Sequence, residues 1–160
     1  MLRIIKNIDD NTVEQLFSIY SESMAVLRKN FGSDSEMRSS YASFLIEFIA
    51  NPKQLILIED INGEWVSCLR AVETAPENWF IEAVETKPEE RKKGYGMKLL
   101  LHTISYLEKL GMKEITSTIL KDNFKSQALH EKCGFVPTND PPINAWNELE
   151  EGTILYRYRK

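Results

Sequence analysis

The sequence predicts an α/β (α+β) fold: a mixed, largely antiparallel sheet of about seven strands with about four helices on both of its faces. Apolar residues recur with strand and helix spacings in the order β-α-α-β-β-β-α-β-α-β-β. The pair Asn62-Gly63, between two apolar runs, is a strong hairpin signal, so meandering strands come early in the chain. A strand, a helix and another strand then follow between residues 79 and 120, which makes the sheet mixed.

The N-terminal part of the chain is predicted to contain one short strand and two helices. Residues 2–7 are apolar-rich and short, as in a strand. Asn11, with a glutamate three residues later, has the spacing of a capping box, and apolar residues from Val13 to Leu27 recur at helical intervals. Ser33 repeats the capping signal ahead of a second helix, which should end near Asn51-Pro52.

The remaining residues are predicted to alternate between strands and helices. The two arms of the hairpin lie over 54–60 and 64–74, and a third strand lies over 79–86. A helix should begin at Gly94 and run towards Leu110, where Gly111 ends it. The elements predicted after it are a strand over 114–120, a short helix over 123–133 and two final strands around a polar, proline-bearing loop.

Length, composition and charge restrict the possible classes of protein. A chain of 160 residues with 42% hydrophobic content is expected to form one globular domain over residues 1–160. No apolar run approaches the roughly 18 residues that span a bilayer, so we expect no membrane segment. Cys68 and Cys133 have neither a disulfide framework nor metal-ligand spacing, which favours a metal-free, cytoplasmic protein. The net charge of −4 disfavours a general nucleic-acid binder.

The stretch Glu90 to Leu100 places basic residues and two glycines directly ahead of a leucine-rich run. It lacks the spacing of a P-loop, and a dinucleotide fingerprint would need a glycine where Leu99 stands. Lys93 to Gly96 match the opening of an RNA-binding RNP1 pattern, but that pattern lies on a strand, whereas helical periodicity follows here. Two interpretations remain: a diphosphate site at a helix N terminus, or a solvated charge run with a glycine-softened helix start.

Two motifs follow each other in the second half of the chain. A strand and Pro88 precede Arg91-x-x-Gly94-x-Gly96, which opens a helix. Further on, Asn123 to Phe135 reads NFKSQALHEKCGF, a helix that begins with asparagine and ends in Glu-Lys-x-Gly-Phe. Together these motifs resemble the acyl-CoA signature and the second motif of the GNAT superfamily of N-acetyltransferases. The resemblance covers roughly residues 79 to 136, and it implies an acetyl-CoA-dependent enzyme that acetylates an amine.

The resemblance also assigns residues to CoA. Backbone groups of the strand that precedes the glycine turn would contact the pantetheine arm, and main-chain N–H groups of the turn would wrap the pyrophosphate. Asn123 would contact the pantetheine region, and Ser126 would donate a hydrogen bond to CoA. The residues so assigned are Val84, Glu85, Thr86, Arg91, Lys92, Lys93, Gly94, Tyr95, Gly96, Asn123 and Ser126.

Acetylation of an amine needs a base more than an acid. An alkylammonium group with a pKa near 10.4 is neutral about once in 2,500 molecules at pH 7, whereas a thiol with a pKa near 8.5 leaves more easily. Glu82 is the preferred base, ahead of Glu73 and Glu85. It shares a strand face with Phe80, which occupies the position of a catalytic glutamate in the histone-acetylating branch of the family, and Glu85 should face the other way. His130 stands where the family often has a tyrosine that serves as the acid, and it either protonates the CoA thiolate or only lines the site or the surface.

The favoured mechanism is direct attack of the amine on acetyl-CoA in a ternary complex. Cys68 has no histidine neighbour in sequence and Cys133 lies on an apolar helix face, so a covalent acetyl-enzyme is disfavoured. Main-chain N–H groups near 84–86 would stabilise the oxyanion. The alternatives are a CoA-binding module without catalysis and, with less support, an RNA-binding domain; a homodimer is left open.

Overall fold

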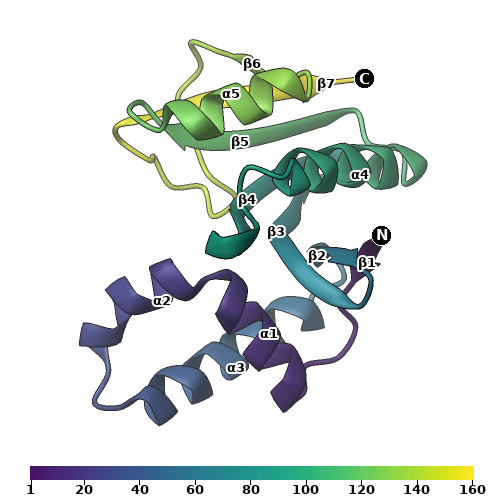
Figure 1. Cartoon of the computed structure of the whole chain (residues 1–160). Helices are drawn as coiled ribbons and strands as arrows, with labels where there is room; N and C mark the ends of the chain where they lie inside the picture. Colours follow the sequence, from purple (N-terminus) through teal and green to yellow (C-terminus); the bar gives the residue numbers. More distant parts are fainter.

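A single seven-stranded sheet organises the molecule in the computed structural model, which describes residues 1–160 (Figure 1). The strand order is β1-β2-β3-β4-β5-β7-β6, and every neighbouring pair is antiparallel except β4 and β5. The predicted class, the mixed sheet and the strand number are therefore confirmed. The strands are β1 (Leu2–Ile4), β2 (Gln54–Ile61), β3 (Glu64–Ala75), β4 (Asn78–Thr86), β5 (Glu114–Leu120), β6 (Val136–Pro137) and β7 (Thr153–Arg159).

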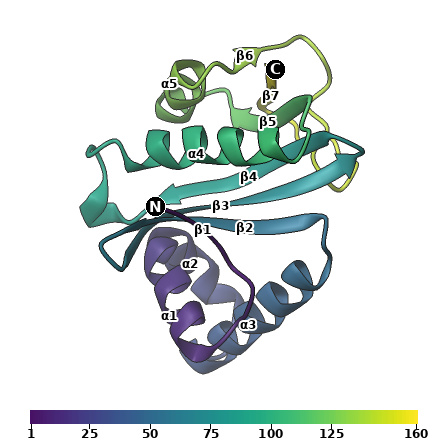
Figure 2. The ribbon, with the colours of Figure 1, turned by 90° about the vertical axis from the view of Figure 1, so that its right-hand side faces the viewer.

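Helices cover both faces of the sheet, as predicted (Figure 2). Three of them pack on one face, and α4 and α5 lie on the other. None has the length and apolar character that crossing a bilayer requires. The helices are α1 (Asp10–Ile19), α2 (Ser21–Leu27), α3 (Asp34–Ala50), α4 (Tyr95–Lys109) and α5 (Phe124–Lys132), with short 3-10 turns at Arg28–Asn30 and Pro88–Glu90.

The start of the chain differs from the prediction in two details. The stretch predicted as one helix is divided at Tyr20, which gives five α-helices in place of about four. Tyr20 is buried and its hydroxyl donates a hydrogen bond to β4, so the chain turns at this residue. The N-cap of α1 is Asp9 and not Asn11, because the Asp9 carboxylate accepts from the Thr12 amide at 2.7 Å. The Ser33 cap of α3 is confirmed.

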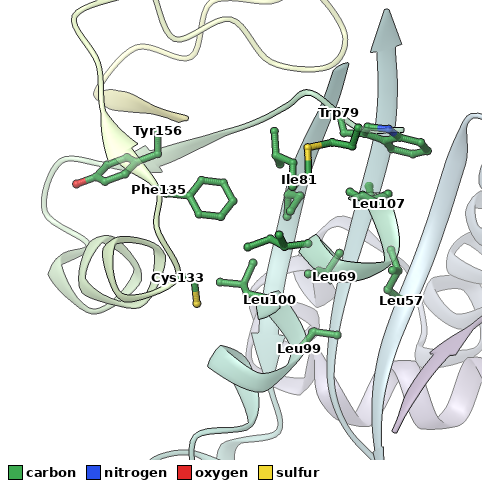
Figure 3. Packing of buried hydrophobic residues seen from close by; sticks show 14 of the residues in the cluster. Leu57, Leu69, Trp79, Ile81, Leu99, Leu100, Leu107, Cys133, Phe135 and Tyr156 are labelled. Atoms are coloured by element: carbon green, nitrogen blue, oxygen red, sulfur yellow. The ribbon is translucent and has the colours of Figure 1, made fainter. Parts of the chain in front are cut away.

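Two hydrophobic cores hold the layers together, one on each face of the sheet. The core beneath α4 and α5 joins the sheet residues Leu69 and Ile81 to Leu100 of α4 and to Phe135 (Figure 3). The other core fills the space between the sheet and α1 to α3. Both cysteines are buried and unpaired, one in each core. The central strands are consequently anchored on both faces, which gives the site a rigid support.

Candidate active site

Strands β4 and β5 separate after a short parallel ladder. Only Asn78 to Phe80 pair with β5, through Glu114 to Thr116. The last hydrogen bond between the two strands comes from Ser117, whose hydroxyl donates to the Ile81 carbonyl at 3.0 Å. Beyond it β5 continues to pair with β7 on its other side, so the second half of β4 has no ladder partner towards β5. Main-chain groups of that half face an opening in the sheet.

A β-bulge lies in the unpaired half of β4. Ala83 has a left-handed φ of 53°, and the register with β3 moves from Arg70↔Glu82 to Cys68↔Glu85. The Tyr20 hydroxyl donates to the Ala83 carbonyl at 2.7 Å and supports this conformation. The bulge also corrects an expectation about Glu85. Regular alternation would turn it away from Glu82, but the extra residue returns both side chains to the same face of the sheet.

The glycine turn after β4 leads directly into α4. Gly94, with a φ of 82°, is the N-cap of this helix, and no side chain caps its first amides. Those N–H groups and the positive end of the helix dipole are therefore available to an anion. A Cβ on Gly94 would meet no atom within 4 Å, whereas one on Gly96 would lie 3.4 Å from Thr86 Oγ1 and 3.5 Å from Leu129 Cδ2. The start of α4 therefore adjoins both β4 and α5 at Gly96, at ordinary contact distance.

Most of the basic side chains at this turn already have acidic partners. Arg91 contacts Glu22 at 2.9 Å and Glu85 at 3.5 Å, and its Nε donates to the Thr86 carbonyl. Lys93 pairs with Glu90, and Lys98 approaches Glu59 at 3.3 Å. Lys92 alone among the four basic residues forms no ion pair. Anion recognition here consequently depends on the main chain more than the sequence suggested. The segment Lys93–Gly96, which resembles RNP1, lies in a turn and the start of a helix, not on a strand.

The second motif forms α5, beside the start of α4. The Asn123 side chain caps this helix by accepting from the Ser126 amide at 3.1 Å. Asn123 is exposed, Ser126 is half-buried and His130 is buried. The two residues predicted to contact CoA, Asn123 and Ser126, therefore lie near solvent, whereas His130, the candidate acid, lies inside the protein.

His130 is held in one tautomer by its own helix. Its Nδ1 lies 2.7 Å from the Ser126 carbonyl, which only accepts, so Nδ1 carries the proton of the neutral ring. Its Nε2 is buried without a hydrogen-bond partner, and the ring packs edge-on against Phe135. Burial lowers the pKa of His130, although the hydrogen bond to Ser126 opposes this. The ring is neutral at pH 7, and its Nε2 is then an acceptor.

A pocket opens on the other side of β4, towards α1 to α3. Its volume is about 390 Å³. Apolar and aromatic side chains from α2, α3 and the connections beside them form most of its wall, and Ala83, Glu85 and Arg70 contribute from the sheet. No motif marks the helical residues of the wall as functional, because their apolar spacing also fits core positions.

The two carboxylates on this face of β4 have different surroundings. Glu82 is bonded to Arg70, with Nε and Oε1 2.9 Å apart. Glu85 lines the pocket, and its nearest polar side chains, Ser23 and Arg91, are both 3.5 Å away. Burial raises the pKa of Glu85, and Glu22 adds to this rise while Arg91 opposes it. Of the two, Glu85 is the less firmly paired.

Comparison with known proteins identifies the family that has this fold. The family model described as "Acetyltransferase (GNAT) family" matches residues 13–135, more than half of the chain. The chain belongs to the GNAT family. No curated protein sequence matches it significantly. The family membership confirms the resemblance seen in the two sequence motifs.

Solved GNAT structures share the fold over nearly the whole chain. The PaiA N-acetyltransferase of Thermoplasma acidophilum, in complex with coenzyme A, superposes with a TM-score of 0.72 at 15% identity, covering 100% of this chain and 99% of that one. An aminoglycoside 6'-N-acetyltransferase complexed with coenzyme A gives 0.71 at 14%, covering 99% and 96%. Tetrahymena GCN5 gives 0.69 at 14%, covering 99% and 95%. Identities this low show a shared fold and leave the substrate open.

Proposed function

We propose that this GNAT protein transfers the acetyl group of acetyl-CoA to a primary amine by direct attack in a ternary complex. One observation carries the proposal: residues 83–86 of β4 border both the pocket and the opening beside the start of α4. Ala83 and Glu85 line the pocket, while the same segment has no β5 partner and its end, Thr86, adjoins Gly96 at the start of α4. A thioester in the opening and an amine in the pocket would meet at this segment.

On the CoA side, the main chain would make most of the contacts. Backbone groups of 84–86 would bind pantetheine, and the uncapped amides from Gly94 to Gly96 would bind the pyrophosphate. Asn123 and Ser126 would approach pantetheine from α5. A main-chain N–H in 84–86 would also hold the oxyanion of the tetrahedral intermediate.

On the amine side, we propose Glu85 as the base in preference to Glu82. The carboxylate takes a proton from the ammonium, and the free amine nitrogen then bonds to the thioester carbon. The C–S bond breaks, and the proton lost by the nitrogen neutralises the CoA thiolate. A raised pKa suits this task, because a base works best when its pKa approaches the working pH. Glu82 remains the sequence-based prediction, but its carboxylate is already bonded to Arg70.

We propose a supporting role for His130. Its Nδ1 proton is engaged by the Ser126 carbonyl, and its Nε2 has no proton in the neutral ring, so it has none to donate to a thiolate at pH 7. The thiolate needs little help in leaving, which makes an acid less important than the base.

The test is thiol release from acetyl-CoA over a panel of amines, with acetylated products identified by mass spectrometry. Glu85→Gln should lower kcat/KM at pH 7 by about 100-fold, the lower range for a lost general base. The deficit should shrink near pH 10, where much of the amine is already neutral. Glu82→Gln is the matched control, since it makes the same change on the same face of the same strand.

Each outcome separates the alternatives. A larger loss in Glu82→Gln than in Glu85→Gln would return the base to Glu82. Binding of acetyl-CoA without transfer to any amine would favour a CoA-binding module that lacks catalysis. Failure to bind CoA at all would contradict the proposal.

A further inference from the structure

The composition of the pocket restricts the amine that can enter it. We infer that the acceptor is a hydrophobic monoamine: one ammonium group carried on an apolar body. This inference rests on the proposed function and names the substrate class of the same site. It excludes polyamines, aminoglycosides and peptide N termini as preferred acceptors.

The wall of the pocket is mainly apolar. Eight of its twelve lining residues are hydrophobic, and they come from α2, α3, the connections beside these helices and β4. Met24, Phe31 and Phe44 are among them, and Phe44 stacks on Tyr41 with ring centroids 6.3 Å apart. An apolar ligand body would release water from this surface at about 25 cal/mol for each Å² buried. A volume of about 390 Å³ admits a small molecule.

The charges of the pocket provide for a single ammonium group. Glu85 is the only carboxylate in the wall. The only other charged lining residue is Arg70, which is held by Glu82 and lies over the ring of Phe44 at 5.0 Å. Glu22 lies near Glu85 but outside the lining, and is paired with Arg91. A second ammonium on the ligand would therefore meet a guanidinium instead of a carboxylate.

Polar groups other than these charges are scarce. The uncharged polar groups of the wall are the hydroxyls of Ser23, Ser40, Tyr20 and Tyr41, and that of Tyr20 already donates to Ala83. An aminoglycoside or a peptide would lose water from many donors and acceptors and regain few hydrogen bonds. A hydrophobic monoamine has none of this cost beyond its ammonium group, which Glu85 receives.

The test is calorimetric binding to the full protein of 2-phenylethylamine, spermidine, kanamycin and dialanine, each alone. We expect 2-phenylethylamine to bind more tightly than the other three by about tenfold or more, from the apolar wall and the lone carboxylate. Equal or tighter binding of any of the other three, or no measurable binding of 2-phenylethylamine, would overturn the inference.

A pair of variants on α2 sharpens this test. Leu27 lines the pocket and is 45% exposed, whereas its neighbour Val26 is 66% exposed and lies outside the wall. Leu27→Glu adds a second carboxylate to the pocket, so the preference for 2-phenylethylamine over spermidine should fall by about tenfold. Val26→Glu should leave the preference unchanged. The same shift in both variants, or none in either, would show that the pocket does not select the amine.

Parallel assays distinguish this inference from the proposed function. Acetyl transfer to spermidine in preference to 2-phenylethylamine would overturn the inference alone. Selective binding of 2-phenylethylamine by a protein that neither binds acetyl-CoA nor releases thiol would remove the proposed reaction and leave a hydrophobic-amine binding site.

Discussion

The two sides of β4 offer different kinds of contact to a ligand. On the α4 side, the features available to a ligand are the half of β4 without a β5 partner, a left-handed glycine and a set of uncapped amides, all of them main-chain features. On the α1–α3 side, the pocket is built from side chains contributed by two helices, the connections beside them and two strands. Main-chain recognition leaves a compact signature in the sequence, because it needs glycines at fixed spacing. Side-chain recognition is distributed along the chain and leaves none.

The largest expected effect comes from disrupting the main-chain features on the α4 side of β4. Gly96→Asp places a carboxylate beside the proposed pyrophosphate site, and like-charge repulsion should weaken acetyl-CoA binding by about 100-fold or more. An acidic residue in the first turn is favourable for the helix itself, so α4 should form normally. Calorimetry measures the affinity, and the melting temperature of the free protein checks the fold.

Gly96→Ala is the graded control for this prediction. Its Cβ would lie at ordinary contact distance from Thr86 and Leu129, so a much smaller loss is expected. Wild-type affinity in Gly96→Asp would mean that the turn is only the start of a helix.

The next prediction concerns the connection between the two sides. Tyr20→Phe removes the hydrogen bond to the Ala83 carbonyl, which should destabilise the protein by about 1–2 kcal/mol. The bulge should become less well positioned, and kcat should fall by about tenfold while KM for acetyl-CoA changes little. Tyr41→Phe is the matched control, since Tyr41 lines the same pocket but its hydroxyl forms no hydrogen bond in the structure. Equal effects in both variants would contradict a positioning role for Tyr20.

His130→Phe should reduce the rate only a few-fold, because the thiolate leaves readily. It should also change the dependence of stability on pH. The pKa of His130 is lowered by folding, so the unfolded chain binds the proton more tightly and wild-type stability falls as pH drops below about 6.5. The variant lacks this group, so its free energy of unfolding should fall less between pH 7 and pH 5. A loss of about 100-fold in rate with unchanged CoA affinity would establish His130 as the acid.

The smallest expected effect is the change in the free energy of unfolding when a carboxylate of β4 is neutralised. The pKa of Glu85 is raised by folding, so its ionised form costs stability above that pKa and costs nothing once both states are protonated. Glu85→Gln should therefore raise the free energy of unfolding slightly at pH 8, by on the order of 1 kcal/mol or less, and the gain should disappear by pH 4. Glu82→Gln should be destabilising at pH 8, because it removes the carboxylate bonded to Arg70. Stabilisation in both variants would mean that the ion pair between Arg70 and Glu82 does not contribute to the stability of the protein.

The sequence predicted the fold and the location of the main-chain site well, because both depend on local patterns. Hairpin turns, caps and apolar spacing gave the element order, and Gly94 marked the start of α4. The predicted roles of the CoA-binding residues remain predictions, as does the single domain over residues 1–160. Their positions along β4, the glycine turn and α5 are consistent with those roles.

What the sequence did not predict depends on long-range contacts. No glycine or proline in the sequence marks the bulge at Ala83. The bulge places the Glu85 side chain on the face opposite to the expected one. The partner of its carbonyl, Tyr20, lies 63 residues earlier in the chain. The division of the first helix has the same origin. The ion pair of Glu82 with Arg70 joins two strands and is invisible to a pattern read along one of them.

The bulge has a consequence for how such a site can arise by insertion or deletion. The residues that flank it, Glu82 and Val84, already point to opposite faces of the sheet, as consecutive residues do in a regular strand. Deleting the single codon for Ala83 would thus leave every remaining side chain of β4 on its present face. The local kink, the carbonyl that Tyr20 contacts and the Ala83 side chain, which packs against the core beneath α1 to α3 and lines the pocket, would be lost. Insertion or deletion of one residue is therefore enough to add or remove this part of the site without other changes to the sequence around it.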